Sequence, residues 1–225
     1  MNSDINKKLQ EQFLYQGLGF CGAITASVTH ELNNILGTID QLSGLLEDLA
    51  LTLTQGDVAT GNQLTAISDR IFKQTARGMT LVKRLNTFAH FRDDVAAKFD
   101  IYDAVENLLA LMKRLALLKK VELILTKPAE EIIVKTNPFS LLEIIFLAIN
   151  RILPCTKKET VIEVVLSKQN SDAVITIKSM HDGTLTRLSD GGYLRLLISH
   201  ISGNTKESFD DVYYNFELKV PIPER

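Results

Sequence analysis

A histidine, a glutamate and an asparagine lie close together near the start of the chain. His30 carries an imidazole, which is a competent nitrogen nucleophile. Glu31 follows it directly and could act as a general base or orient the ring. Asn34 lies one helical turn later, about 40° around a helix, where its carboxamide could hold a water molecule for attack on an acyl-phosphate partner. The spacing therefore predicts a site for phosphoryl transfer and for its reversal by hydrolysis.

The position of His30 on its helix favours this chemistry over a packing role. At about 100° per residue, the neighbouring apolar residues fall roughly 140° to 240° away from it; they are Val28, Leu32, Ile35, Leu36 and Ile39. The residues within roughly 60° of His30 are small or polar; they are Ala23, Ala26, Ser27, Asn33, Asn34 and Gly37. Such a stripe presents an imidazole to a docking protein.

Two plainer interpretations of His30 stay open at this point. A single histidine on a helix surface is often incidental. Metal binding needs more ligands than His30 and Glu31, whose side chains point about 100° apart. The sequence therefore predicts no metal site here, and a functional role for His30 depends on what surrounds it.

Two long helices must position these residues. Apolar residues recur with helical period over 5–53 and again over 62–91, with a break at 54–57. Two long helices joined by a short loop form an antiparallel hairpin. A lone pair cannot cover both apolar stripes, whereas two hairpins in a four-helix bundle can. The pattern therefore predicts a homodimer through the hairpin.

The pattern changes to alternating strands and helices after 92–94, which divides the chain into domains 1–97 and 98–225. Strands are predicted at 99–102, 121–126, 132–135, 161–167, 173–178 and 213–220. Helices are predicted at 103–118, capped by Asp103, at 139–153 after Asn137 and Pro138, and at 193–201. The predicted fold class is α+β, a helical hairpin followed by an α/β sandwich.

Composition excludes several classes of protein. With 225 residues, 45% hydrophobic, 23% charged and a formal charge of −2, the chain is an ordinary globular protein without the basic excess of a nucleic-acid binder. Its two cysteines cannot build a disulfide framework or a four-ligand zinc site. No apolar run approaches the ~20 residues of a membrane span, and residues 1–12 lack the apolar core of a signal peptide. We expect a cytoplasmic protein without membrane insertion, which begins directly with its helical hairpin.

The run His30-Glu31-Leu32-Asn33-Asn34 resembles the phosphoacceptor motif of two-component sensor histidine kinases, in which an acidic residue follows the histidine and Asn or Thr stands four positions after it. The hairpin resembles their dimerisation and histidine-phosphotransfer domain. Phe99-Asp100 before a helix is similar to the entry of their ATP-binding domain, and Lys135-Thr136-Asn137-Pro138 is similar to the stretch before its asparagine box. The resemblance extends over nearly the whole chain.

The second domain departs from that family where ATP chemistry takes place. The asparagine box of the family carries two asparagines and then a lysine. The matching positions here are Phe146, Asn150 and Leu153, so only Asn150 is kept. The Asp-x-Gly-x-Gly box is reduced to Asp182-Gly183, which also fits an ordinary turn. The last glycine box reads Gly191-Gly192-Tyr193-Leu194, with two large residues where phosphates need close backbone approach.

These losses would leave a magnesium–triphosphate complex with few ligands and no backbone nest. We therefore expect no cofactor on this chain, with Asn150, Asp182 and Gly183 as degenerate remnants. The combination resembles the kinase-derived histidine phosphotransferases of phosphorelays. It implies a dimer whose His30 exchanges a phosphoryl group with response-regulator receiver domains, which supply the Mg²⁺. Whether the chain is itself an enzyme is left open. The alternatives are a divergent but active ATP-dependent kinase or phosphatase, and a non-catalytic regulator that binds receivers.

Overall fold

The computed structural model describes residues 2–54, 61–93, 95–184 and 192–223. Two long helices come first and strands mixed with short helices follow, so the predicted fold class is confirmed. The elements are α1 (Asn2–Thr54), α2 (Gly61–His90), β1 (Ala97–Asp100), α3 (Ile101–Leu118), β2 (Glu122–Thr126), β3 (Ile133–Thr136), α4 (Pro138–Ile152), the 3₁₀ helix η1 (Leu153–Cys155), β4 (Val161–Gln169), β5 (Asp172–Met180), α5 (Gly192–His200), β6 (Asn204–Phe209) and β7 (Tyr213–Pro221).

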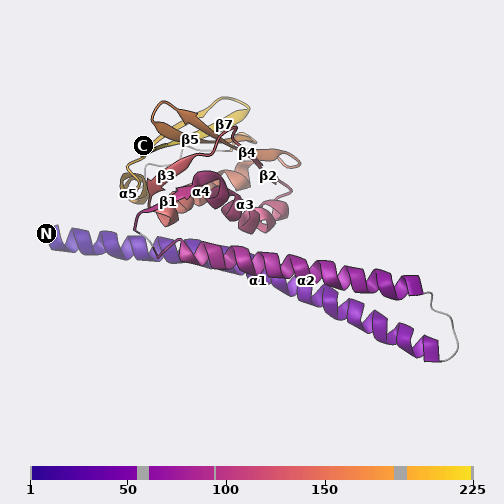
Figure 1. Cartoon of the computed structure of the whole chain (residues 1–225). Coiled ribbons are helices and arrows are strands. Elements are labelled where there is room, and N and C mark those ends of the chain that lie inside the picture. Colours follow the sequence, from indigo (N-terminus) through magenta and orange to yellow (C-terminus); the bar gives the residue numbers. More distant parts are fainter. Residues whose placement is uncertain (1, 55–60, 94, 185–191, 224–225) are drawn as a thin grey trace.

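The helices α1 and α2 form the predicted antiparallel hairpin, which projects beyond the rest of the molecule (Figure 1). They approach closely at Gly78, where an added Cβ would lie 3.6 Å from the Ile35 side chain. This is an ordinary van der Waals distance, so the two helices pack side by side at this level. Positions 55–57 of the predicted break lie outside the described residues, and Thr54 is the last residue of α1. The hairpin therefore holds His30 near the middle of a long, continuous helix.

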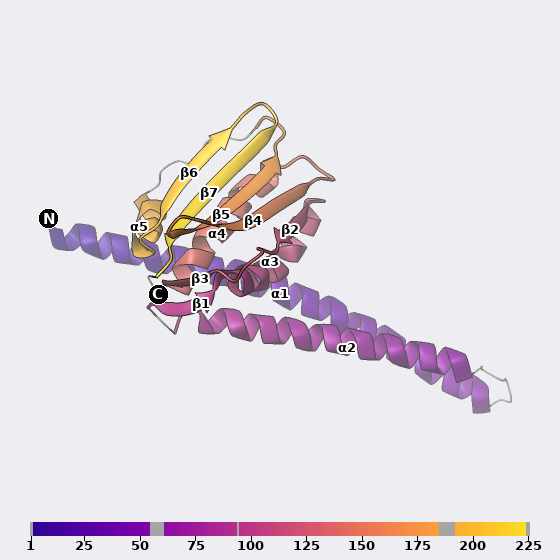
Figure 2. The same cartoon turned by 45° about the horizontal axis from the view of Figure 1, so that its top comes forward.

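The α/β domain is built as a sheet with helices on one side. Five strands pair in the order β2-β4-β5-β7-β6, parallel between β2 and β4 and antiparallel elsewhere, and β1 pairs with β3 in a small separate sheet. Helices α3 and α4 lie between the large sheet and the hairpin, which makes three layers (Figures 1 and 2). The apolar helix α4 begins at its Asn137 cap, whose Oδ1 accepts a hydrogen bond from Ser140 N at 2.7 Å.

Two local predictions were wrong. The cap of α3 is Asp100 and not Asp103, because Asp100 Oδ1 accepts a hydrogen bond from Tyr102 N at 2.8 Å. The helix therefore begins at Ile101, and the preceding strand is shifted toward the N-terminus. The strand β6 was not predicted, because its sequence, Asn204–Phe209, is largely polar. It is an edge strand that pairs with β7 on one side, and it needs few apolar residues.

The hairpin and the α/β domain share one hydrophobic core. Phe20 of α1 packs edge-on against Phe88 of α2, with ring centroids 5.1 Å apart. It also packs at a tilt against Phe146 of α4, with ring centroids 4.7 Å apart. Phe139 of α4 completes the group, 5.3 Å from Phe20. Phe20 and Phe88 are only 2% and 3% exposed. Because both helices of the hairpin are fixed to α4 by these rings, the α/β domain has a defined position on the hairpin.

Polar contacts hold α3 on the hairpin beside this core. Ser27 Oγ donates to the Leu111 carbonyl at 3.1 Å. Arg84 forms a bidentate pair with Glu106, at 2.6 and 2.8 Å, and its own carbonyl accepts a hydrogen bond from Asn107 Nδ2 at 3.1 Å. Bidentate pairing fixes direction as well as distance. Residues of both hairpin helices are therefore held in register with α3.

We expect Phe20→Ala to lower the free energy of unfolding by about 3–5 kcal/mol, because it removes a buried ring and leaves a cavity between the two parts of the molecule. The measurement is denaturant unfolding followed by far-UV circular dichroism at fixed protein concentration. Leu118→Ala is the control, since that side chain is 63% exposed and its loss should cost little. A cost near that of the control would contradict the shared core.

Candidate functional site

His30 lies in the middle of α1, and its side chain is exposed to solvent. Asn34 Nδ2 lies 3.4 Å from His30 Nδ1, so the two predicted site residues are side by side. Rotation of the carboxamide exchanges its oxygen and nitrogen, so Asn34 can meet either neutral tautomer of the ring. Contact at Nδ1 leaves Nε2 as the ring nitrogen that a partner can reach.

The surroundings of His30 match the predicted small and polar stripe at most positions. Ala26, Asn33, Asn34 and Gly37 are all exposed. Two positions differ. Ala23 is partly buried and packs against the core, and Ser27 is 2% exposed and donates its hydroxyl proton to the Leu111 carbonyl of α3. The stripe is therefore bounded on one side by the contact with α3, and the remaining small residues beside His30 are exposed to solvent.

Glu31 faces α2 rather than His30. Its carboxylate forms an ion pair with Arg77, and its side chain is 22% exposed. Sequence analysis missed Arg77, because the two residues are 46 positions apart and meet only through the register of the hairpin. The ion pair places the Arg77 guanidinium against Glu31, the residue next to the candidate phosphoacceptor His30 in the sequence. It also links α1 to α2 at this level of the hairpin.

The positions that align with the asparagine box hold no polar pair. Phe146 is 5% exposed and packs against Phe20, and Leu153 is also buried. Asn150 is exposed on α4. Within the described ranges, no three His, Cys, Asp or Glu side chains gather in a way that could hold a metal ion. Most of the positions that align with the asparagine box are therefore packed in the hydrophobic core.

Asp182 is engaged within its own turn. Its Oδ1 accepts hydrogen bonds from the Thr184 hydroxyl at 2.5 Å and from Thr184 N at 3.0 Å. These hydrogen bonds, chiefly the one from the Thr184 hydroxyl, hold the pKa of the exposed Asp182 carboxyl below its usual range. Gly183 follows with a φ of +88°, which favours glycine. The remnant therefore has the geometry of a turn, while Gly191 lies outside the described residues.

Tyr193 fixes the start of α5 onto α4. Its side chain is buried, and its hydroxyl donates to Glu143 Oε1 at 2.5 Å. Burial raises the pKa of the Glu143 carboxyl, while the hydrogen bond from Tyr193 acts in the opposite direction. Burial, reinforced by the neighbouring carboxylate, raises the pKa of Tyr193 as well. Sequence analysis placed Tyr193 on former phosphate-binding ground, but it did not foresee the buried Glu143 partner.

Among the residues that the structure describes, one helical stretch, Pro138–Cys155, is long and apolar enough to cross a membrane. Of this stretch, 67% is buried inside the protein, where α4 packs between the sheet and the hairpin. A core helix of a soluble domain passes the same test of length and composition. Its apolar composition is accounted for by packing on two sides.

Comparisons with known proteins find structural similarity only. No family model and no curated protein match the chain. Among solved structures, a histidine kinase from Burkholderia phymatum matches with 11% identity over 85% of this chain and 99% of its own, with a TM-score of 0.49. The Acinetobacter baumannii histidine kinase AdeS matches with 15% identity over 83% of this chain and 96% of its own, with a TM-score of 0.48. The histidine kinase domain of the E. coli osmosensor EnvZ matches with 12% identity over 57% of this chain and 89% of its own, with a TM-score of 0.45. All three are histidine kinases, the family whose motifs the sequence resembles.

Proposed function

We propose that this protein is a histidine phosphotransfer protein of a two-component phosphorelay. His30 accepts a phosphoryl group from the aspartate of one receiver domain and donates it to the aspartate of another. The observation that carries the proposal is the exposed His30–Asn34 pair on a face of the hairpin that the α/β domain leaves uncovered. Small residues beside the pair, such as Ala26 and Gly37, allow a helix of the receiver to approach closely.

The transfer step follows from the two side chains. With the proton on Nδ1 accepted by Asn34 Oδ1, the Nε2 lone pair attacks phosphorus, the N–P bond forms, and the P–O bond to the receiver aspartate breaks. The aspartate leaves as a carboxylate, and the phosphorylated imidazole donates the group onward by the reverse step. Mg²⁺ bound by the receiver offsets the negative charge. The Arg77 ion pair favours a positioning role for Glu31 over that of a proton acceptor.

In this proposal the α/β domain uses no ATP. Phe146 and Leu153 are buried apolar residues, and Asp182 Oδ1 is occupied by Thr184. Tyr193 aligns with the last glycine box, where phosphates need a close backbone approach, and its hydroxyl is held against Glu143. The domain then serves as a structural partner that keeps the hairpin in one arrangement, and the chain acts in the cytoplasm on phosphate that other proteins supply.

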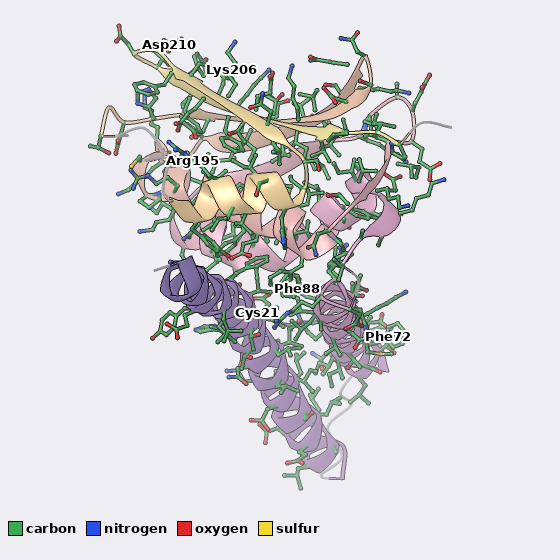
Figure 3. All side chains as sticks on the ribbon, turned by 90° about the vertical axis from the view of Figure 1, so that its left-hand side faces the viewer. Cys21, Phe72, Phe88, Arg195, Lys206 and Asp210 are labelled. Carbon is green, nitrogen blue, oxygen red and sulfur yellow. The ribbon has the colours of Figure 1, made fainter. Side chains whose placement is uncertain are left out.

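The protein acts as a homodimer in this proposal, because an apolar stripe on the hairpin is left exposed by the part of the chain that the structure describes. The stripe comprises Leu14, Leu18 and Leu36 of α1 together with Phe72, Met79 and Val82 of α2, all at least 52% exposed. Figure 3 shows Phe72 on the outer side of α2, whereas Phe88 lies where α2 runs beneath the α/β domain. Two hairpins that bury such stripes against each other form a four-helix bundle.

The test is incubation of the full-length protein with a phosphorylated receiver domain from the same organism. We expect a base-stable, acid-labile phosphoryl group on the protein, assigned to His30 by mass spectrometry, and no label from ATP with Mg²⁺. Labelling from ATP alone would favour a divergent kinase and contradict the proposal. Absence of labelling from every receiver of that organism would contradict it too, and would favour a non-catalytic receiver-binding regulator.

A further inference from the structure

A groove lies where α1, α2 and α3 meet, beside the predicted site. Its volume is about 280 Å³, just below the usual size range of small-molecule sites. Its apolar lining comes from all three helices and comprises Val28, Leu81, Ala110, Leu111 and Leu117. The groove is thus built partly from the hairpin and partly from the α/β domain, and it offers an apolar body a place to pack.

Cationic side chains from two helices line the same groove. Arg77 and Arg84 come from α2, and Lys113 and Arg114 come from α3. The two arginines of α2 are seven residues apart, so they lie within about 20° of each other on one face of that helix. Glu31 is the carboxylate among the lining residues. The groove therefore carries a clear excess of positive charge.

Only part of this charge is neutralised by the protein. Arg77 pairs with Glu31, and Arg84 pairs with Glu106. For Lys113 and Arg114, no carboxylate of the described residues lies within ion-pairing distance. Arg114 is also partly buried. The groove thus has two unmatched cations beside an apolar wall.

We propose that this groove binds a small organic dianion, such as a phosphomonoester or a dicarboxylate, with an apolar body. The charged end pairs with Lys113 and Arg114, and the body packs on Leu111 and Leu117. Val28 and Leu81 of the hairpin also line the groove, so a ligand that fills it would contact both the hairpin and α3. Binding does not depend on phosphoryl transfer, so the site is independent of the proposed function.

Phenyl phosphate is the probe, because it joins a dianion to an apolar ring. In isothermal titration calorimetry with the full-length protein, we expect phenyl phosphate to bind at least about tenfold more tightly than inorganic phosphate or phenol. Inorganic phosphate lacks the apolar ring, and phenol lacks the dianionic group. The double variant Lys113→Gln/Arg114→Gln should weaken phenyl phosphate binding about tenfold or more, since hydrogen bonds between charged groups are lost. Bound phenyl phosphate should also raise the Tm of the unmodified protein.

The matched control is Lys83→Gln/Lys119→Gln, which removes the same charge from exposed positions on α2 and at the end of α3 outside the groove. It should bind phenyl phosphate as the unmodified protein does. The proposal is overturned by any of three results: no binding of phenyl phosphate, equal binding of phenol, or equal weakening by the control variant. A protein that exchanges phosphate with receivers yet fails this titration would overturn the groove proposal and leave the proposed function standing.

Discussion

Replacing His30 with alanine is expected to abolish phosphoryl exchange with receiver domains and to leave the fold intact. His30 is exposed and its side chain contacts Asn34 of the same helix, so its loss removes the nucleophile without opening a cavity. Alanine also favours a helix interior more than histidine does. The measurement is transfer of labelled phosphate from a phosphorylated receiver, which should fall to the detection limit, alongside thermal unfolding, which should change little.

The matched control for this variant is His90→Ala. His90 is an exposed histidine at the end of α2, where its Nδ1 lies 2.7 Å from Asp93 Oδ2. Because it lies away from the His30 stripe, its replacement should leave phosphoryl exchange unchanged. Retention of a labelled phosphoryl group by the His30→Ala protein would show that another residue is the acceptor and would refute the site.

The features that depend on local periodicity were predictable from the sequence. Helical period gave both helices of the hairpin, and the Asn137-Pro138 start placed the apolar helix α4 to within a residue. The closeness of His30 and Asn34 follows from one turn of helix, so it too could be predicted. Such contacts join residues near in sequence, and helix geometry alone determines them.

The features that depend on distant pairing were not predictable in the same way. Ser27 lies on the exposed stripe by angle, but its hydroxyl reaches a carbonyl 84 residues away once α3 docks on the hairpin. The Arg77 pair with Glu31 likewise requires the register of the hairpin. At the start of α3, Asp100 and Asp103 are both chemically suitable caps. The choice is made by β1, whose pairing with β3 extends to Asp100 and ends where the helix begins.

In the proposed dimer, the position of the exposed apolar stripe would let dimerisation and phosphoryl transfer occur on one hairpin. Phe20 of α1 and Phe88 of α2 contact the α/β domain. On α1, Leu18 of the stripe lies roughly 160° around the helix from Phe20, and on α2, Phe72 lies roughly 160° around the helix from Phe88. His30 lies roughly 120° around α1 from Leu36. A second hairpin can therefore cover the stripe while the α/β domain stays on the opposite side and His30 stays accessible.

Placing carboxylates on this stripe, in the double variant Leu36→Glu/Met79→Glu, is expected to convert the dimer into a monomer. These residues directly follow Ile35 and Gly78, which touch across the hairpin, so they lie at the same level of the bundle. Burying each unpaired carboxylate costs about 3 kcal/mol or more, which weakens association on the order of 100-fold or more. Sedimentation velocity at micromolar concentration measures the change.

Leu118→Glu is the control, because it adds a carboxylate at an exposed apolar residue of α3 that is outside the stripe. It should remain dimeric, whereas a double variant that still sediments as a dimer would rule out the stripe as the interface. The monomer should still accept phosphate on His30, since the His30–Asn34 pair is complete within one chain. Its Tm should fall at equal concentration, because association no longer stabilises the folded state and the stripe stays in water.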